Sequence, residues 1–125
     1  MKYKAVSENH LYSKAYTRGS KAVTENVVVY ILRDKAADRL RRARPDRTKI
    51  NRIGLTVSKK IGGAVQRNRV KRIIREAYRR LDTEKTLKKG YLVIIVARTP
   101  ALTAKSGDIY KNLSYAMNKL GMIIS

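Results

Sequence analysis

A series of basic side chains between residues 59 and 80 has the spacing needed to bind the phosphates of a nucleic acid. Four of them recur at every fourth residue, which places them on one face of an α-helix. They are Arg67, Lys71, Arg75 and Arg79. Like charges four residues apart repel by roughly 0.2–0.5 kcal/mol per pair, and an external anion relieves that repulsion. The spacing therefore predicts a helix that binds a polyanion.

Further polar side chains flank this row, and together they form the set of candidate nucleic-acid contacts. The set is Lys59, Lys60, Arg67, Asn68, Arg69, Lys71, Arg72, Arg75 and Arg79. Arginine predominates, and its planar guanidinium binds phosphate and stacks on bases, whereas lysine is a point charge. Backbone N–H groups near Gly62–Val65, at the expected start of the helix, also favour phosphate. The alternative is a basic surface helix without a partner, although a solvent-facing helix normally mixes both signs of charge.

The residues that protein nucleases use for catalysis are sparse in this chain. It has no cysteine, a single histidine at His10, and nine acidic residues that form no obvious pair on a strand. A protein metallonuclease needs clustered carboxylates or imidazoles to hold its ions. We therefore expect no catalytic residue and no metal site in the protein itself.

Length and charge limit the class of protein. The 125 residues suit a single domain, residues 1–125, and carry a formal net charge of +21. Charge of this size indicates a polyanionic partner, and the arginine content favours nucleic acid over a membrane or an acidic protein. The longest apolar run, Tyr91–Ala97, is too short to span a bilayer, and no signal peptide is visible. We expect a cytoplasmic protein that does not bind membranes.

Hydrophobic periodicity predicts the elements that would position these residues. Helices are expected at 7–18, 64–81 and 107–121, and strands within 21–33, 50–58 and 91–98. Residues 1–6 are expected to be a flexible basic leader. Residues 34–49 are expected to form a mobile basic loop, in which a short helix around 36–42 is an open alternative. Gly54 is expected to mark a bulge or a close approach. The order predicts an α+β fold with helices packed on one sheet.

An apolar stripe on the predicted helix 64–81 lies opposite the basic row. It consists of Val70, Ile73, Ile74, Ala77 and Leu81. This i, i+3, i+4, i+7 spacing is typical of a helix that packs one face against a core. The helix is therefore expected to dock on the sheet and to present its cations to a partner.

Three segments resemble the bacterial ribonuclease P protein subunit. Residues 58–79 resemble the signature of that family, with Arg67-Asn68-Arg69 followed by Lys71-Arg72 and Arg75 at its centre. Residues 90–101 resemble the late strand of the family, which ends in Ala-Arg-x-Pro. The early Leu11-Tyr12, Tyr16 and Gly19 lie where the family usually has two phenylalanines and a glycine.

The resemblance implies a more specific fold. The family has a two-layer αβββαβα sandwich that is ribosomal-protein-like, with one mixed sheet packed by helices. It carries the basic helix in a left-handed βαβ crossover, although right-handed crossovers are the rule. The additional strand of this order is expected near residues 20–25.

The resemblance also implies a function. Such a chain is the protein component of ribonuclease P, an endoribonuclease that removes the 5′ leader of precursor tRNA. The catalytic RNA subunit performs the hydrolysis with Mg²⁺, which we expect to be held mainly by that RNA. The expected partners are the ribonuclease P RNA and precursor tRNA, and no DNA.

In the family the single-stranded leader lies in a cleft between the first helix and the sheet. The residues that correspond to its lining are Tyr12, Tyr16, Val28 and Tyr30, with Arg67, Asn68, Lys71 and Arg75 along its edge. An extended RNA strand can stack on such rings largely without sequence preference. Core packing for Tyr12 and Tyr16, and burial within the sheet for Tyr30, are the alternatives.

Three other functions remain as alternatives. The main one is a structural RNA-binding protein such as a ribosomal protein. A helix-turn-helix DNA-binding module would need a second helix before residue 64, where the sequence predicts a strand instead. A protein-only nuclease would cleave precursor tRNA without any RNA subunit.

Overall fold

The structure is a computed structural model that describes residues 3–6, 9–43 and 50–124. Its strands are β1 (Tyr3–Ala5), β2 (Ser20–Val23), β3 (Val27–Arg33), β4 (Asn51–Thr56) and β5 (Tyr91–Ala97). Its helices are α1 (Asn9–Arg18), α2 (Lys35–Ala43), α3 (Ala64–Glu84) and α4 (Ser106–Lys119), with a 3₁₀ turn η1 (Thr99–Leu102). The mixed α+β fold that the sequence predicts is confirmed.

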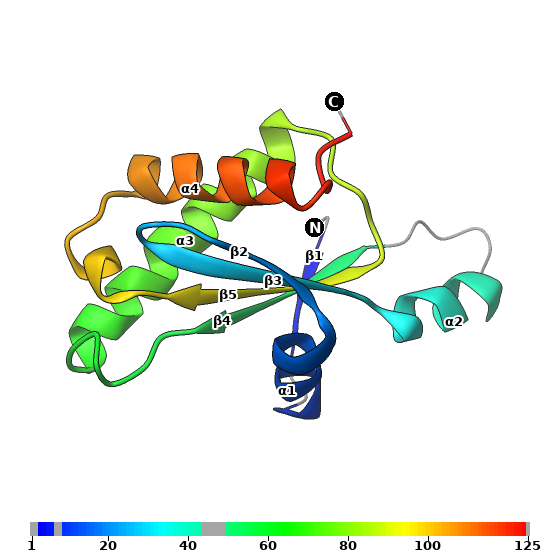
Figure 1. Ribbon diagram of the computed structural model, residues 1–125, viewed down its shortest axis with the longest axis horizontal. Coiled ribbons are helices and arrows are strands. Elements are labelled where there is room, and N and C mark those ends of the chain that lie inside the picture. The colour runs from blue at the N-terminus through cyan, green and yellow to red at the C-terminus, as the bar shows by residue number, and fades with distance from the viewer. Residues whose placement is uncertain (1–2, 7–8, 44–49, 125) are drawn as a thin grey trace.

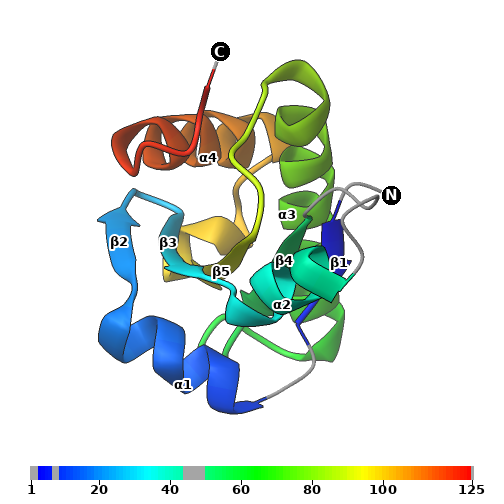
Figure 2. The same ribbon diagram turned by 90° about the vertical axis from the view of Figure 1, so that its right-hand side faces the viewer.

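The five strands form one mixed sheet in the order β1-β4-β5-β3-β2. Strand β4 is parallel to both of its neighbours, β1 and β5, whereas β3 is antiparallel to β5 and β2. Helix α3 therefore forms the crossover between the parallel strands β4 and β5. With these strands pointing away from the viewer in Figure 2, the chain passes anticlockwise from β4 over the helical layer to β5, which is the left-handed connection expected.

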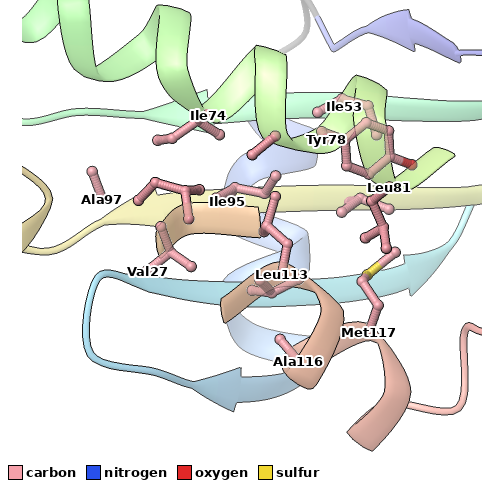
Figure 3. Close-up of a cluster of buried hydrophobic side chains, with 14 of the residues drawn as sticks. Val27, Ile53, Ile74, Tyr78, Leu81, Ile95, Ala97, Leu113, Ala116 and Met117 are labelled. Atoms are coloured by element: carbon pink, nitrogen blue, oxygen red, sulfur yellow. The ribbon is translucent and has the colours of Figure 1, made fainter. Parts of the chain in front are cut away.

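Helices cover both faces of the sheet (Figure 1). Helices α3 and α4 lie side by side on one face and enclose the larger hydrophobic core with the strands. Figure 3 shows Ile74 and Leu81 of α3, Leu113 and Met117 of α4 and Ile95 of β5 within this core. Helix α1 covers part of the opposite face, so it adds a partial third layer to the two-layer sandwich.

The apolar stripe of α3 packs as its periodicity predicts. All five residues of the stripe are buried in the larger core: Val70, Ile73, Ile74, Ala77 and Leu81. The helix also continues three residues beyond the predicted end, to Glu84. Because one side of α3 is committed to the core, its basic residues can only occupy the other side.

Two segments differ from the sequence prediction. Residues 3–5 of the predicted flexible leader form β1, which pairs with Asn51–Ile53 of β4, and Val6 is buried. Local sequence patterns do not reveal this pairing, because it joins residues almost fifty positions apart. Residues 35–43 of the predicted mobile loop form α2, and the remaining residues 44–49 lie outside the described part of the chain.

Candidate nucleic-acid interface

Helix α3 begins at a turn that contains two adjacent glycines, Gly62 and Gly63. Gly63 is the N-cap, and its backbone N–H donates to Oε1 of Gln66 at 2.6 Å. Gly62 has φ +152°, and a Cβ at this position would lie 2.9 Å from the same Gln66 oxygen. The two glycines therefore leave room for the side chain of Gln66 to fold back and cap the helix. In many helices the N-cap side chain also caps, but glycine has no side chain to do so.

The basic row lies on the side of α3 away from the core. Arg75 and Arg79 are exposed and Arg67 and Lys71 are half-buried, while the apolar stripe is buried against the sheet. Among the described residues, none of these four cations forms an ion pair with a carboxylate. Asn68, which follows Arg67, is exposed as well. The row is therefore a one-sided cationic surface that nothing in the described part of the protein neutralises.

Two other predicted contact residues are engaged within the protein. The guanidinium of Arg69 donates to the backbone oxygen of Leu102 at 3.0 Å and to that of Ala104 at 2.9 Å. These bonds hold the end of η1 against α3, a structural role that sequence reasoning missed. Arg72 lies 3.4 Å from Glu76 in an exposed pair, which solvent screens and which contributes little to stability.

Lys59 and Lys60 lie in the loop that joins β4 to α3, and both side chains are exposed. This loop follows Thr56, the last residue of β4, and precedes the Gly63 cap. From there α3 runs along the opposite face of the sheet from α1 (Figure 1). Arg67 therefore lies near the end of the sheet where Thr56 lies, and Arg75 and Arg79 lie progressively farther along α3.

A second surface, on the α1 side of the sheet, carries tyrosine side chains. The rings of Tyr16 and Tyr30 are in edge-to-face contact, with centroids 5.0 Å apart and an angle of 68°. The hydroxyl of Tyr16 lies 2.7 Å from Oγ1 of Thr56. Tyr16 is 39% exposed, and Tyr30 and Val28 are half-buried. We call Tyr16, Val28, Tyr30 and Thr56 the aromatic face.

The register of the sheet explains why these residues meet. Val28 pairs with Val96 of β5, and Thr56 pairs with the same Val96 from the other side. Cross-strand partners point to the same face of a sheet. Sequence reasoning missed Thr56 and Val96, although the alternation of side chains along β4 and β5 would have placed them on this face once the pairing was known.

Tyr12 packs beneath α1 and is half-buried, as Tyr30 and Val28 are. A Cβ at Gly54 would lie 2.7 Å from the Tyr12 hydroxyl oxygen and 2.7 Å from Cδ1 of Ile94. The glycine thus marks the close approach that the sequence predicts. Burial is the main cause that raises the pKa of Tyr12, and the neighbouring Tyr16 hydroxyl raises it further. A hydrogen bond with the Leu55 backbone lowers this pKa by a smaller amount. Tyr12 therefore packs beneath α1 without being fully buried, and its place in the leader cleft stays a prediction.

Most acidic side chains of the described residues are engaged. Buried Asp34 and Asp82 pair with Arg52 and Lys89, at 2.7 and 2.8 Å. Glu84 pairs with Arg80 at 3.1 Å. In the described residues there is no group of three or more histidine or acidic side chains placed to hold a metal ion. No helix among them is long and apolar enough to cross a membrane.

A family model described as Ribonuclease P matches residues 1–121 of the sequence. The chain belongs to this family. The ribonuclease P protein component of Clostridium botulinum (strain Loch Maree / Type A3) is 34% identical over 122 residues, covering 98% of both chains. That of Listeria innocua serovar 6a is 34% identical over 119 residues, covering 95% of this chain and 88% of the relative. The resemblance seen in the sequence is thus confirmed.

Solved ribonuclease P proteins share the architecture. The RNase P protein of Staphylococcus aureus superposes with a TM-score of 0.72 at 26% identity, covering 100% of this chain and 99% of that one. The RNase P protein of Thermotoga maritima superposes with a TM-score of 0.69 over 90% of this chain. At 19% identity, the second comparison concerns the fold alone.

Proposed function

We propose that this ribonuclease P family member binds the ribonuclease P RNA and the 5′ leader of precursor tRNA. In this role it assists the removal of the leader that yields the mature 5′ end of tRNA. The observation that carries the proposal is the one-sided, unpaired row Arg67, Lys71, Arg75 and Arg79 on α3. Cations presented without internal carboxylates release counterions when they meet phosphates, which drives binding to RNA.

The leader is assigned to the aromatic face. Tyr16 offers a partly exposed ring that is fixed at its edge by Tyr30 and at its hydroxyl by Thr56. A base stacked on such a ring contributes roughly 1–3 kcal/mol, and stacking tolerates any base. Lys59, Lys60 and Arg67 follow β4 in the chain and would attract the leader phosphates at this end of the sheet.

Hydrolysis is assigned to the RNA subunit. The catalytic Mg²⁺ ions would be held mainly by RNA, because the protein's described carboxylates largely serve ion pairs and helix caps. Asp108, for example, accepts a hydrogen bond from the Lys105 backbone at the start of α4. The protein would then contribute binding and orientation of the substrate, in the cytoplasm, with neither DNA nor a membrane as partner.

Reconstitution with a ribonuclease P RNA tests the proposal. At low Mg²⁺, the protein should increase cleavage of precursor tRNA by that RNA, and protein freed of RNA should not cleave. The variant Arg67→Gln/Lys71→Gln/Arg75→Gln should lose most of this effect. A matched variant with the same loss of charge on and before α4, Lys105→Gln/Lys111→Gln/Lys119→Gln, should keep it.

Two results would contradict the proposal. Cleavage by the RNA-free protein would make it a protein-only nuclease. Selective recovery of ribosomal RNA with the tagged protein would instead favour a structural role in the ribosome.

A further inference from the structure

Helix α2 is a cationic element that projects from the end of the sheet (Figure 1). Its nine residues include Lys35, Arg39, Arg41 and Arg42 but only one acid, Asp38. The side chains of Lys35, Arg39 and Arg42 are exposed, and among the described residues none of the three has a carboxylate partner. Helix α2 therefore presents a cationic surface that is separate from the basic row of α3.

The three exposed cations of α2 share one side of the helix. Lys35, Arg39 and Arg42 are spaced i, i+4 and i+7, which falls within one narrow stripe at 3.6 residues per turn. Repulsion between cations at this spacing opposes helix formation. The repulsion would be relieved by a row of phosphates, which Arg in particular binds through its planar fork.

Asp34 caps α2 and fixes its start to β4 and to the residue before β5. Asp34, which is buried, accepts a hydrogen bond from the backbone N–H of Ala36 at 3.1 Å and so caps the helix. Its two carboxylate oxygens accept from Nε and Nη2 of Arg52 on β4, at 2.7 and 3.0 Å. Its own backbone N–H donates to the oxygen of Gly90, just before β5, at 2.9 Å. This clamp sets the direction in which the helix leaves the sheet.

Helix α2 and the Val28–Thr56 side of the aromatic face lie at opposite ends of the sheet. Val28 is near the start of β3, while α2 follows Arg33 at its end. Val28 lies five residues from Arg33, about 17 Å at roughly 3.3 Å per residue, and Tyr30 lies three residues from it, about 10 Å. A leader strand that runs from Tyr16 toward Thr56 and Lys59 would lead away from α2. The partner of α2 is therefore expected to be the RNA subunit.

We propose that α2 is a second RNA-binding element, in which Lys35, Arg39 and Arg42 contact the phosphate backbone of the ribonuclease P RNA. The Asp34–Arg52 clamp would orient the helix for this contact. The proposal rests on the proposed function, because it assumes that the chain binds this RNA.

Binding of the purified protein to ribonuclease P RNA, measured over a range of salt concentrations, tests the proposal. The variant Lys35→Gln/Arg39→Gln/Arg42→Gln should bind about 10–100-fold more weakly at about 0.1 M salt, with a salt slope smaller by roughly 2–3. It keeps Asp34 and Arg52, and circular dichroism and thermal melting verify its fold. The variant Lys105→Gln/Lys111→Gln/Lys119→Gln removes the same charge elsewhere and should change binding much less.

The outcomes separate the two proposals. Failure of the unaltered protein to bind the RNA would overturn the proposed function and this inference with it. Tight binding by the unaltered protein, with equal losses in the α2 variant and the α4 control, would overturn the role of α2 alone. A loss by the α2 variant seen only with precursor tRNA, and growing with leader length, would also overturn it, because α2 would then contact the leader.

Discussion

The hydroxyl of Tyr16 on α1 lies 2.7 Å from Oγ1 of Thr56, the last residue of β4. This hydrogen bond joins α1 to β4, the strand that lies between its two parallel neighbours β1 and β5. It also holds the Tyr16 ring edge-to-face with Tyr30. The Tyr16 hydroxyl therefore has a specific partner, and the ring is fixed while 39% of the residue stays exposed.

Removal of the Tyr16 ring should weaken binding of the leader. We expect Tyr16→Ala to raise the dissociation constant for leader-bearing precursor tRNA by an amount equivalent to roughly 1–3 kcal/mol, through the loss of one stacked base. Binding of mature tRNA, which has no leader, should not change. Fluorescence binding titrations of the holoenzyme measure both. Tyr115→Ala, which removes a 57% exposed ring from α4, is the control, and equal losses with both RNAs would contradict the assignment.

A methyl group at Gly54 should destabilise the fold. It would lie 2.7 Å from the Tyr12 hydroxyl oxygen and 2.7 Å from Cδ1 of Ile94, so α1 would have to shift. We expect Gly54→Ala to lower the free energy of unfolding by about 1–3 kcal/mol, as overpacking commonly does. Gly107→Ala, where no atom lies within 4 Å, should leave stability unchanged or raise it. Urea denaturation compares the two, and equal stability would show that α1 adapts freely.

Arg69 and Arg72 should differ in their contribution to stability, although both belong to the predicted contact set. Arg69→Ala removes two hydrogen bonds to carbonyl groups next to η1 and should lower the free energy of unfolding by roughly 1–3 kcal/mol. Arg72→Ala breaks only an exposed pair and should change stability by less than about 0.5 kcal/mol. Thermal denaturation distinguishes them. A stable Arg69→Ala protein would show that η1 does not depend on this anchor.

The sequence predicts local and periodic features of this molecule better than features that depend on distant partners. The stripe from Val70 to Leu81 is predictable because its period alone defines a buried helix face. Strand β1 is not, because its stability comes from pairing with β4. Helix α2 is only an alternative at the level of sequence, because its cap, Asp34, is held by Arg52, eighteen residues away. The inward direction of Arg69 cannot be predicted either, since its acceptors lie more than thirty residues later.

The contact between α3 and α4 at Glu84 should make stability depend on acid pH. The Tyr110 hydroxyl and Arg80 donate hydrogen bonds to Glu84, and both bonds, first that of Tyr110, lower the pKa of this carboxyl from its usual value. A lowered pKa stabilises the fold above the unfolded-state pKa, and this contribution is lost as the pH falls through the folded-state pKa. Tyr110→Phe keeps a ring against Arg80 but removes one donor. The free energy of unfolding of this variant should therefore fall less between about pH 5 and pH 3 than that of the unaltered protein. Urea denaturation at each pH measures this, and an equal fall in both proteins would contradict the prediction.

The unpaired row on α3 should make the stability of the free protein depend on anions. Sulfate or phosphate that binds Arg67, Lys71 and Arg75 only in the folded state adds RT ln(1 + [anion]/Kd), about 2.7 kcal/mol at one hundred times Kd. Thermal melts in sulfate should therefore exceed those in chloride at equal ionic strength. The variant Arg67→Gln/Lys71→Gln/Arg75→Gln should lose most of this difference, whereas Lys105→Gln/Lys111→Gln/Lys119→Gln should retain it. Equal melting temperatures in the two salts would mean that the row does not bind anions in the free protein, and its cations would then act only when RNA supplies closely spaced phosphates.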